Sequence, residues 1–437
     1  MKILFEKADI LFGDDLEVVF NGYLGVQDDK IIYVGNEKPK GKYDVVKDMS
    51  NKLLMPGLVN SHSHAAMTLL RGVGTGLQLH EWLFDHVIPI EDKLVPNDIR
   101  VGNQLAIMEM FSTGTVSFSD MYDRPVAQIE AVTKSKIKVN ICRPIIAFGP
   151  EDEPEKNPRF VESLWLYDNY HNTDHGRIKI DLGIHAEYTS TEGSVGAYAV
   201  EAKKRNANIH VHVSETIKEH NECIERYGKT PTKWLHDLGI LDTTSQFAHG
   251  VALEDEDLNI IKEKGITVVH NPSSNMKLGS GFAKINKMVE MGINVSLGTD
   301  GAASNNNLNM FEEMHLAAII HKGYENDATI LPSKTVIKMA TVNGARMQGR
   351  LDTGVIKEGF KADIIALDFN KPHLIPNINY LDSVIYSAQG SDVCMTMIDG
   401  SIVYEDGIFK TIDAEQTYKE VTEITERLYE VYDGKKR

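Results

Sequence analysis

The middle of the chain, from Met55 to about Arg350, alternates short apolar runs with longer stretches whose apolar residues recur at helical spacing. Eight such runs follow in order: GLVNSH (57–62), TVSFSD (115–120), KVNICR (138–143), KIDLGIH (179–185), NIHVHVS (208–214), SQFAHG (245–250), ITVVHN (266–271) and INVSLGTD (293–300). Apolar strands that alternate with helices predict a parallel sheet of the α/β class. Eight of them predict a (β/α)8 barrel of the TIM type, and a doubly wound open sheet is the alternative fold.

The two ends of the chain have another pattern, which is typical of antiparallel strands separated by turn residues. The N-terminal segments are KILFEKADILF, EVVFNGYLGVQ and KIIYVGN, and the C-terminal ones are VIKEGFKADIIALDF, SVIYSAQG and VCMTMIDGSIVYEDG. The last segment, AEQTYKEVTEITERLYEVY, predicts a helix. We therefore expect a small β-sandwich domain composed of residues 1–56 and 350–437, with the barrel, residues 57–349, inserted between its halves.

Composition narrows the class of partner. The 437 residues carry a formal net charge of −17, which argues against nucleic acid and anionic membrane surfaces as partners. The three cysteines, Cys142, Cys223 and Cys394, are scattered without a CxxC pair, as is typical of a reducing compartment. The sequence shows neither a signal peptide nor an apolar run of about 18 residues. We therefore expect a cytoplasmic protein.

The polar ends of the apolar runs carry the candidate chemistry. In a barrel, the carboxyl ends of all strands meet on one face. Seven of the eight runs have His or Asp at the last position or within two residues of it, although the chain has only 16 His. The residues at or near these ends are His62, His64, Asp120, Arg143, His185, His212, His249, His270 and Asp300.

Two of these histidines, His62 and His64, are two positions apart on one strand and therefore point to the same side. Imidazole is a common ligand for zinc and iron, so the pair is a candidate metal site, although two surface histidines would give the same spacing. Asp300 precedes a glycine, which is also typical of a turn or a helix cap. It becomes a candidate ligand because three candidate histidine ligands need an anionic partner.

Six longer motifs carry a resemblance to a known family. They are MPGLVNSHSHAAMTLLRG (55–72), EWLFDHVIPIEDKL (81–94), HVHVSET (210–216), HNPSSNMKLGSG (270–281), LGTDGAASNNNLNMFEEM (297–314) and GVIKEGFKADI (354–364). The chain resembles the amidohydrolase superfamily of metal-dependent hydrolases. Within it, the chain is similar to the hydrolytic deaminases that act on 5′-methylthioadenosine and S-adenosylhomocysteine. The resemblance extends over essentially the whole chain, and the LGTDGAASNN and PIED segments are its most specific parts.

The resemblance implies one divalent metal ion per subunit, Zn²⁺ in the first place, with Fe²⁺ or Mn²⁺ as alternatives. The implied ligands are His62, His64, His212 and Asp300. Binuclear relatives use a carboxylated lysine at the end of the fourth strand, where this chain has His185, so a mononuclear site is expected.

The resemblance also implies three catalytic residues. Glu215 transfers a proton to the ring nitrogen next to the amino-bearing carbon, as a carboxyl group can. Asp300 accepts the proton of the attacking water. His249 hydrogen-bonds that water and the developing tetrahedral oxygen.

The implied substrate contacts extend the site. Glu91 holds the ribose hydroxyls and His185 contacts the sugar, while Glu215 and Asp300 also touch the base. Arg143 and Arg159 face the 5′ substituent, since an arginine binds a carboxylate in bidentate fashion. Trp82 stacks on the base, although it could equally be a core residue. An exposed helix for Glu91 and a solvated loop for Arg159 are the corresponding structural alternatives.

The expected function is therefore the hydrolytic deamination of adenosine-type nucleosides to inosine analogues and ammonia. The candidate substrates are 5′-methylthioadenosine, S-adenosylhomocysteine, 5′-deoxyadenosine and adenosine, and the expected assembly is a homo-oligomer. The alternative within the superfamily is an enzyme for a free base or a triazine, of the guanine deaminase, cytosine deaminase or chlorohydrolase type. A non-enzymatic scaffold is disfavoured because every implied ligand position and Glu215 are filled.

Overall fold

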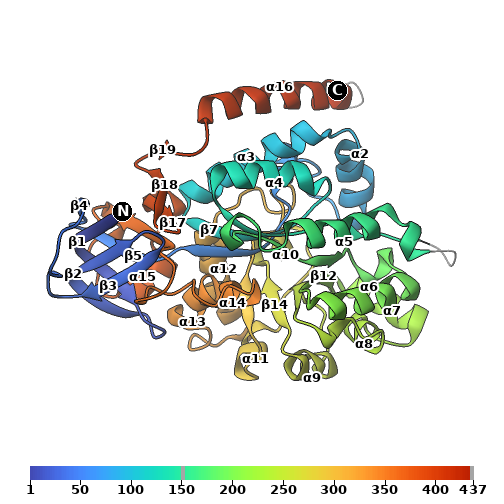
Figure 1. Ribbon diagram of the computed structural model, residues 1–437. Helices are drawn as coiled ribbons and strands as arrows, with labels where there is room; N and C mark the ends of the chain where they lie inside the picture. The colour runs from blue at the N-terminus through green and yellow to red at the C-terminus, as the bar shows by residue number, and fades with distance from the viewer. Residues whose placement is uncertain (149–152, 434–437) are drawn as a thin grey trace.

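The computed structural model describes residues 1–148 and 153–433, which form an α/β fold (Figure 1). Ten short strands of the middle region form two parallel sheets. One sheet has the order β10 (Ile178–Ile180), β8 (Lys138–Cys142), β7 (Thr115–Met121) and β6 (Leu58–Ser63). The other has the order β15 (Val295–Leu297), β14 (Thr267–His270), β13 (Ser245–His249), β12 (Ile209–Val213), β11 (Leu182–Ile184) and β9 (Pro144–Ile145).

Each of the eight predicted apolar runs contains a strand, and the strands follow chain order within each sheet. Every residue of β6, β7 and β12 is buried, which explains why these runs are continuous rather than alternating. The chain changes from one sheet to the other just after the third run, at β9, and again within the fourth run. The fourth is interrupted at Asp181, whose buried carboxylate accepts hydrogen bonds from the side-chain amides of Asn140 and Asn208, each 3.0 Å away.

Helices lie around these strands in Figure 1. They are α3 (Pro96–Ser112), α4 (Pro125–Ser135), α5 (Pro158–Tyr170), α6 (Glu192–Arg205), α7 (Ile217–Tyr227), α8 (Pro231–Asp237), α9 (Asp255–Lys264), α10 (Pro272–Lys277), α11 (Ile285–Glu290), α12 (Met310–Glu325), α13 (Ser333–Met339) and α14 (Val342–Met347). Local sequence sets their ends. In α6, the Thr191 side chain accepts from the backbone N–H of Ser194 at 3.1 Å, and Asn206 ends the helix in a left-handed conformation with φ of 50°.

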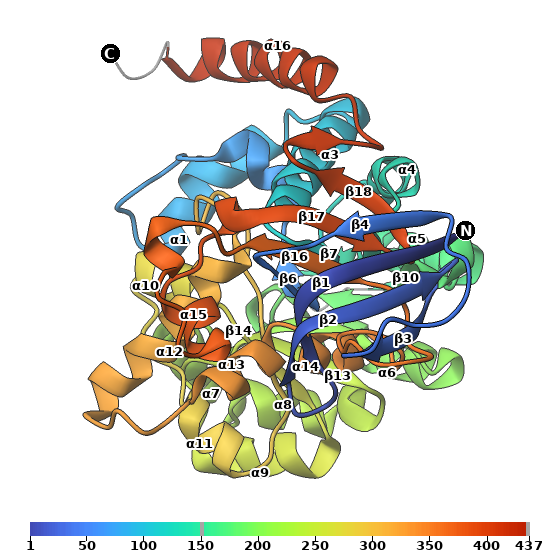
Figure 2. The same cartoon turned by 90° about the vertical axis from the view of Figure 1, so that its left-hand side faces the viewer.

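The two ends of the chain meet in one nine-stranded sheet, which faces the viewer in Figure 2. Its order is β19 (Ile408–Phe409), β18 (Ser401–Glu405), β17 (Val393–Ile398), β16 (Ile364–Asp368), β5 (Lys52–Pro56), β1 (Lys2–Phe12), β2 (Glu17–Gln27) and β3 (Lys30–Gly35), with β4 (Val45–Asp48) beside β1. The antiparallel pairing of β5 with β16 joins the N-terminal strands to the C-terminal ones. The strand pattern common to both ends therefore reflects a shared sheet.

One predicted strand is wrong. SVIYSAQG begins inside a helix, α15 (Tyr380–Tyr386), which starts where the Asn379 side chain accepts from the backbone N–H of Leu381 at 3.0 Å. A short apolar run such as Val384–Ile385 fits a strand and a helix equally well, and the capping asparagine decides between them. The first half of VIKEGFKADIIALDF also forms turns, so only Ile364–Asp368 is a strand.

The C-terminal helix α16 (Ala414–Asp433) is confirmed, and it lies across the top of the molecule in Figure 1. It packs on α3 through the buried residues Ile424 and Leu428. The hydroxyl of Tyr429 donates to the carbonyl of Leu69 at 2.9 Å, just beyond the first parallel strand. The last segment of the chain thus supports the segment that follows β6.

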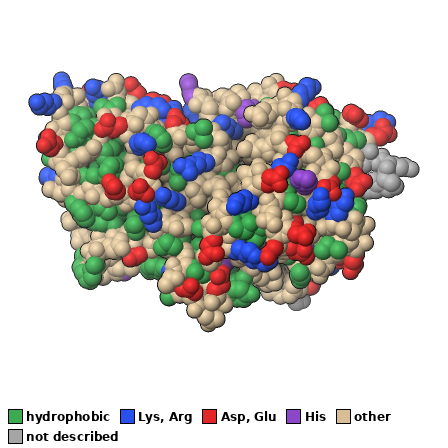
Figure 3. Space-filling model, turned by 90° about the horizontal axis from the view of Figure 1, so that it is seen from below, with side chains coloured by type: hydrophobic (Ala, Val, Ile, Leu, Met, Phe, Trp, Pro, Cys, Tyr) green, Lys and Arg blue, Asp and Glu red, His purple; other side chains and the backbone are tan. Residues whose placement is uncertain are grey.

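The surface shows no concentration of one charge on the face seen in Figure 3, where acidic and basic side chains are interspersed. Among the helices of residues 1–148 and 153–433, none is long and apolar enough to cross a membrane.

Candidate active site

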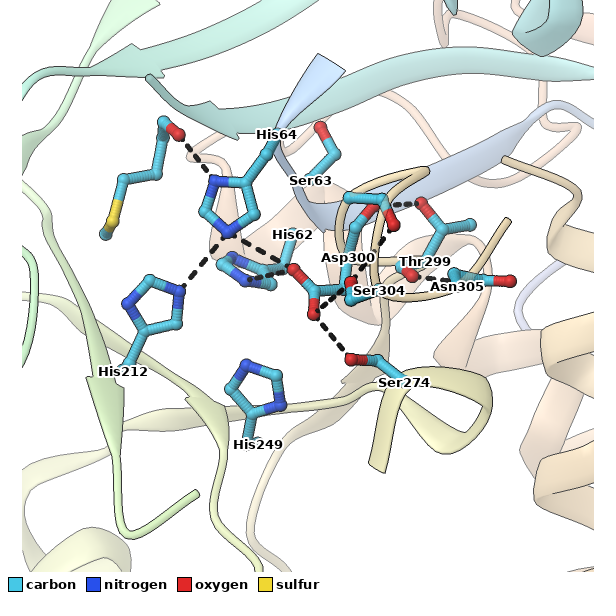
Figure 4. A network of polar contacts seen from close by, with 12 residues as sticks. His62, Ser63, His64, His212, His249, Ser274, Thr299, Asp300, Ser304 and Asn305 are labelled. Carbon is cyan, nitrogen blue, oxygen red and sulfur yellow. Dashed lines mark hydrogen bonds and ion pairs between the residues drawn. The ribbon is translucent and has the colours of Figure 1, made fainter. Parts of the chain in front are cut away.

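Four histidines and one aspartate meet at the carboxyl ends of the parallel strands (Figure 4). Asp300 Oδ1 lies 3.4 Å from His62 Nε2 and 3.2 Å from His64 Nε2, and His212 Nε2 lies 3.4 Å from His64 Nε2. Potential ligand atoms lie within 4.8 Å of one another in two overlapping groups, His62–His212–His249 and His62–His64–Asp300. Because both groups contain His62, all five side chains face one small volume, which fits a single metal ion.

Backbone carbonyls fix the orientation of two of the rings. His64 Nδ1 is 2.6 Å from the carbonyl of Met121, and His212 Nδ1 is 2.6 Å from the carbonyl of His185. A carbonyl can only accept, so Nδ1 carries a proton in both rings and Nε2, the atom that could ligate a metal, faces inward. This is the outer-layer arrangement that holds a metal-ligating histidine in one tautomer.

His62 lies deepest in the cluster and is fully buried. Its Nδ1 is 2.8 Å from Nε2 of His210, whereas its own Nε2 has no hydrogen-bond partner. A buried polar atom without a partner is costly, and a cation among these side chains would satisfy it. Burial lowers the pKa of His62 to about 4 and also holds the pKa of His212 well below its usual range. Both imidazoles are therefore neutral, which is the form that ligates metal.

Asp300 has its two carboxylate oxygens in different roles. Oδ2 accepts from the hydroxyls of Ser274 at 2.6 Å and Ser304 at 2.8 Å, so Oδ1 faces the histidines. Burial opposes ionisation of this carboxyl, but its interaction with His62 and His64, whose Nε2 atoms face Oδ1, outweighs the effect of burial and keeps the pKa of Asp300 well below its usual range. The aspartate is therefore anionic and complements neutral imidazole ligands.

Asp300 and two other residues at the strand ends adopt left-handed backbone conformations, with φ of 62° at Asp300, 73° at His249 and 49° at Ser214. Such conformations cost energy in residues other than glycine and are concentrated at functional sites. They mark the three turns that direct side chains into the cluster.

Glu215 follows β12 and is buried beside the cluster, with its Oε2 3.9 Å from Nε2 of His249. Burial raises the pKa of Glu215, so the carboxyl keeps its proton to higher pH than an exposed glutamate. The turn is held by Glu219, whose carboxylate accepts the backbone N–H groups of Ser214 at 3.1 Å and Glu215 at 2.7 Å. His249 is oriented by Asn275, whose Oδ1 is 2.9 Å from its Nδ1.

A cavity of about 470 Å³ opens onto this cluster. Its lining includes every predicted site residue except His62, which lies beneath the other ligands, and Arg143. The predicted residues in the lining are His64, Trp82, Glu91, Arg159, His185, His212, Glu215, His249 and Asp300. The remaining wall is largely apolar, with Leu79, Leu83, Ile88 and Ile146 among its residues.

Three predicted substrate contacts have firm positions in this wall. Glu91 accepts a hydrogen bond from the hydroxyl of Tyr122, and burial raises the pKa of Glu91. His185 Nδ1 is 2.9 Å from Thr189 Oγ1, and burial lowers the pKa of His185 to about 4. Trp82 is only 5% exposed and donates from Nε1 to the carbonyl of Val73 at 3.2 Å. It therefore combines both interpretations, since it packs in the core and also lines the cavity.

The two arginines differ. Arg159 lines the cavity and makes a bidentate ion pair with Asp123, in which Nη2 and Oδ2 are 2.7 Å apart. Arg143 pairs with Glu162 outside the lining, and its Nε is 3.6 Å from Asp123 Oδ1. Arg143 therefore reaches the cavity wall only through Asp123.

Other polar residues at the strand ends lie away from the metal ligands. Asp120 accepts from Ser63 Oγ at 2.7 Å and from the backbone N–H of Ala65 at 2.6 Å, and so holds the turn after β6. His270 Nε2 is 3.1 Å from His321 Nε2 behind the cluster.

Sequence reasoning missed Asp123, Glu219 and Asn275. Ser274 and Asn275 lie within the quoted HNPSSNMKLGSG motif, but nothing in their local pattern showed which side chain they would meet.

Parallel strands with a histidine–aspartate cluster at their carboxyl ends define a metal-dependent hydrolase of the amidohydrolase type. Residues 53–403 match the model of the amidohydrolase family, and the chain belongs to this family. The resemblance inferred from the motifs is thereby confirmed.

Relatives with known names extend over nearly the whole chain. A 5-methylthioadenosine/S-adenosylhomocysteine deaminase of Acetivibrio thermocellus is 44% identical over 434 residues, which cover 98% of this chain and 100% of that protein. A 5′-deoxyadenosine deaminase of Methanosarcina mazei is 41% identical over 431 residues, which cover 98% of each chain. The crystal structure of an adenosine deaminase from Xanthomonas campestris with bound zinc is similar with a TM-score of 0.93 and 29% identity, over 98% of both chains.

Proposed function

We propose that this protein is a hydrolytic deaminase of adenosine-type nucleosides, with 5′-methylthioadenosine, S-adenosylhomocysteine and 5′-deoxyadenosine as its substrate class. The observation that carries the proposal is the position of Glu215. Its buried carboxyl lines the cavity beside His249 and next to the metal-ligand cluster, where it can protonate a bound ring. The names of relatives 41% and 44% identical over nearly the full chain support the same reaction.

The residues fit one divalent metal ion, Zn²⁺ or alternatively Fe²⁺ or Mn²⁺. His62, His64, His212 and Asp300 would hold it, because their inward-facing atoms include the partnerless Nε2 of His62. When bound, such an ion lowers the pKa of a water molecule and supplies a nucleophile at neutral pH. The run that includes β11 ends in His185 rather than lysine, which supports a mononuclear site.

Two side chains then transfer protons, and a third stabilises the developing oxygen. Glu215 donates a proton to the ring nitrogen adjacent to the amino-bearing carbon, which makes that carbon electrophilic. Asp300 takes a proton from the attacking water, and Nε2 of His249 hydrogen-bonds the oxygen that develops at the tetrahedral carbon. Asp300 passes the proton that it took from the water to the amino group, which leaves as ammonia. The remaining hydroxyl proton returns to Glu215 as the oxygen becomes the ring carbonyl.

The remaining cavity residues would position the nucleoside. Glu91 accepts from the two ribose hydroxyls and His185 contacts the sugar, while Trp82 packs against the base. Arg159 faces the 5′ substituent. Arg143 has an indirect role in this proposal, since it lies outside the lining and contacts Asp123.

We also propose that the two parallel sheets are parts of one closed (β/α)8 barrel of residues 57–349. The strands keep chain order without the reversal of a doubly wound sheet. In addition, the backbone N–H of Asp300 donates to the carbonyl of His62 at 2.9 Å, which links the end of the last run to the first strand.

For residues 1–56 and 350–437 we propose a β-sandwich domain. Strand β1 pairs with β2 and with both β4 and β5, so the sheet branches there. A separate apolar cluster packs inside it and draws residues from both chain ends, including Phe5, Leu24, Ile364 and Met397.

The test is ammonia release from a panel of 5′-methylthioadenosine, S-adenosylhomocysteine, 5′-deoxyadenosine, adenosine, guanine and cytosine, each with and without a chelator. Chelator-sensitive release from the adenosine compounds is the expected result. Release from a free base alone would keep the metal site and overturn the proposed substrate contacts. Release that persists in the chelator after complete metal removal would overturn the metal-dependent reaction.

A further inference from the structure

An ion pair in the cavity wall has no part in the proton transfers. Asp123 and Arg159 both line the cavity, and their side chains are 36% and 25% exposed. The two groups meet as a planar fork, in which each guanidinium nitrogen Nη faces one carboxylate oxygen of Asp123. Such bidentate geometry holds both groups in place in the cavity wall.

The pair lies beside the residues proposed to hold the ribose. Asp123 follows β7 and Arg159 begins α5, whereas the metal-ligand cluster belongs to other strands. Asp123 directly follows Tyr122, whose hydroxyl donates to Glu91, and Arg159 lines the same cavity as His185. A group attached to the ribose on the side away from the base would therefore reach this pair.

Charges on this part of the wall balance. Besides Glu91, Glu215 and Asp300, which have roles in the proposed reaction, the lining contains two acidic residues, Asp92 and Asp123, and two basic ones, Arg124 and Arg159. Outside the lining, Arg143 is paired with Glu162. A lone carboxylate that approached Arg159 would meet the carboxylate of Asp123 at the same place and would gain little. A group that carries an ammonium and a carboxylate on neighbouring atoms would complement both members of the pair.

We propose that Asp123 is a specificity-determining residue, and that it forms with Arg159 a subsite for an α-amino acid zwitterion on the 5′ substituent. Asp123 accepts from the ammonium group and Arg159 donates to the carboxylate, so four charges alternate in sign. Apolar Pro144 and Ile146 line the same wall and suit the thioether chain between the ribose and the zwitterion. This inference rests on the proposed function.

The first test uses the wild-type protein. The values of kcat/KM are compared for S-adenosylhomocysteine, for its analogue without the ammonium group, 5′-S-(3-carboxypropyl)thioadenosine, and for its analogue without the carboxylate, 5′-S-(3-aminopropyl)thioadenosine. 5′-Methylthioadenosine serves as the reference. We expect the zwitterion to exceed both single-charge analogues by about tenfold or more, since each lost charged hydrogen bond leaves one partner unpaired. Equal values for the zwitterion and the carboxypropyl analogue would overturn the proposal.

The second test uses Asp123→Asn. It should lower kcat/KM for S-adenosylhomocysteine about tenfold more than for 5′-methylthioadenosine, and should raise the value for the carboxypropyl analogue relative to the zwitterion. Glu162→Gln is the matched control, because Glu162 pairs with the neighbouring Arg143 outside this cavity. It should leave the ratio between the substrates unchanged.

A parallel loss for all substrates in Asp123→Asn would show that Asp123 only supports the wall, and would overturn the proposal. The 5′-methylthioadenosine arm separates this inference from the proposed function. If the wild-type protein does not deaminate that reference, the proposed function fails. If it deaminates the reference without distinguishing the charged analogues, only the zwitterion subsite fails.

Discussion

At the scale of single residues, the site depends on which atom of each side chain is left free. His64 and His212 both use Nδ1 on a backbone carbonyl, and Asp300 uses Oδ2 on two serine hydroxyls. The atoms that remain, Nε2 and Oδ1, face one another around the partnerless Nε2 of His62. Burial keeps His62 and His212 neutral, whereas Asp300 raises the pKa of His64 to about 9 and is itself held in its anionic form by the neighbouring histidines.

The role of Glu215 as the proton donor gives the first prediction. Glu215→Gln keeps the shape and the hydrogen-bonding capacity of the side chain but cannot transfer a proton. We expect deamination to fall about 10²- to 10⁴-fold, while the metal content measured by elemental analysis stays at the wild-type value. Loss of metal together with activity would assign Glu215 to the ligand set, and activity within tenfold of the wild type would contradict its role.

Glu313 gives a prediction for stability. Its carboxylate is fully buried and accepts from the backbone N–H of Ser273 at 3.2 Å and from Asn305 at 2.7 Å, and burial raises its pKa to about 8 from an ordinary 4.5. Between these values the unfolded chain loses the proton while the folded protein keeps it. The contribution of Glu313 to the free energy of unfolding is therefore complete below pH 4.5 and is lost as the pH rises towards 8.

In Glu313→Gln this pH dependence should disappear. The slope of the unfolding free energy against pH, measured by urea denaturation between about pH 5 and 8, should become less negative by up to about 1.4 kcal/mol per pH unit. Glu312→Gln, on the exposed side of the same helix turn, should leave the slope unchanged. An identical slope in wild type and Glu313→Gln would contradict the assignment.

The sequence identifies those site residues whose side-chain type and position in the predicted fold point to the same role. His62, His64, His212, His249 and Asp300 stand at strand ends, where a parallel fold brings side chains together, and their side chains can ligate metal. Asp123 and Glu219 are ordinary acidic residues by every local criterion. Their positions in the site come from contacts with Arg159 and with the turn at Ser214, which the sequence does not encode locally.

At the scale of elements, the turn between β12 and α7 illustrates how a short segment directs a catalytic group. Ser214 takes a left-handed conformation, and Glu219 from the first turn of α7 accepts the backbone N–H groups of Ser214 and Glu215. Glu219→Ala removes this acceptor while leaving Glu215 in place. We expect kcat to fall at least about tenfold with a smaller change in KM, since misplacement of the proton donor affects the transition state more than binding.

A control for this prediction is Glu222→Ala on the same helix, where the side chain pairs with Arg226 at the surface. It should leave kcat unchanged. A rise in KM with constant kcat in Glu219→Ala would mean that the turn serves binding rather than catalysis.

The elements themselves were predictable to different degrees. The eight apolar runs of the middle region each contain a strand because burial on both faces requires continuous apolar sequence. SVIYSAQG failed because its short apolar core, Val384 and Ile385, fits either period, and the cap at Asn379 lies outside the run. The interruption of the fourth run at Asp181 was not predictable either, because it depends on contacts with Asn140 and Asn208, which are distant in the sequence.

At the scale of the whole molecule, a buried ion cluster joins the parallel strands to the sheet of the chain ends. Lys138 begins β8 and is 4% exposed, and its Nζ contacts Asp363 before β16 and lies 2.9 Å from Asp399 Oδ1 after β17. Asp363 also accepts the backbone N–H of Asp399 at 2.9 Å. One lysine thus bridges two carboxylates that belong to the other part of the fold, and Asp399 also lies 3.7 Å from Nζ of Lys361.

Without that lysine, the parallel strands and the sheet of the chain ends should unfold at different urea concentrations. Lys138→Met leaves the carboxylate of Asp363 buried without its cation and removes one of the two lysines near Asp399, so we expect the free energy of unfolding to fall by about 3–5 kcal/mol. Lys357→Met is the matched control, because its pair with Asp14 is 49% and 59% exposed and should change stability by less than about 1 kcal/mol.

Urea denaturation followed by far-ultraviolet circular dichroism and by the fluorescence of the three tryptophans, Trp82, Trp165 and Trp234, measures both variants. All three tryptophans lie between residues 57 and 349, so a transition seen by circular dichroism before fluorescence changes would show that the sheet of the chain ends unfolds first. A loss in Lys138→Met no larger than that in Lys357→Met would mean that the cluster contributes nothing to the connection.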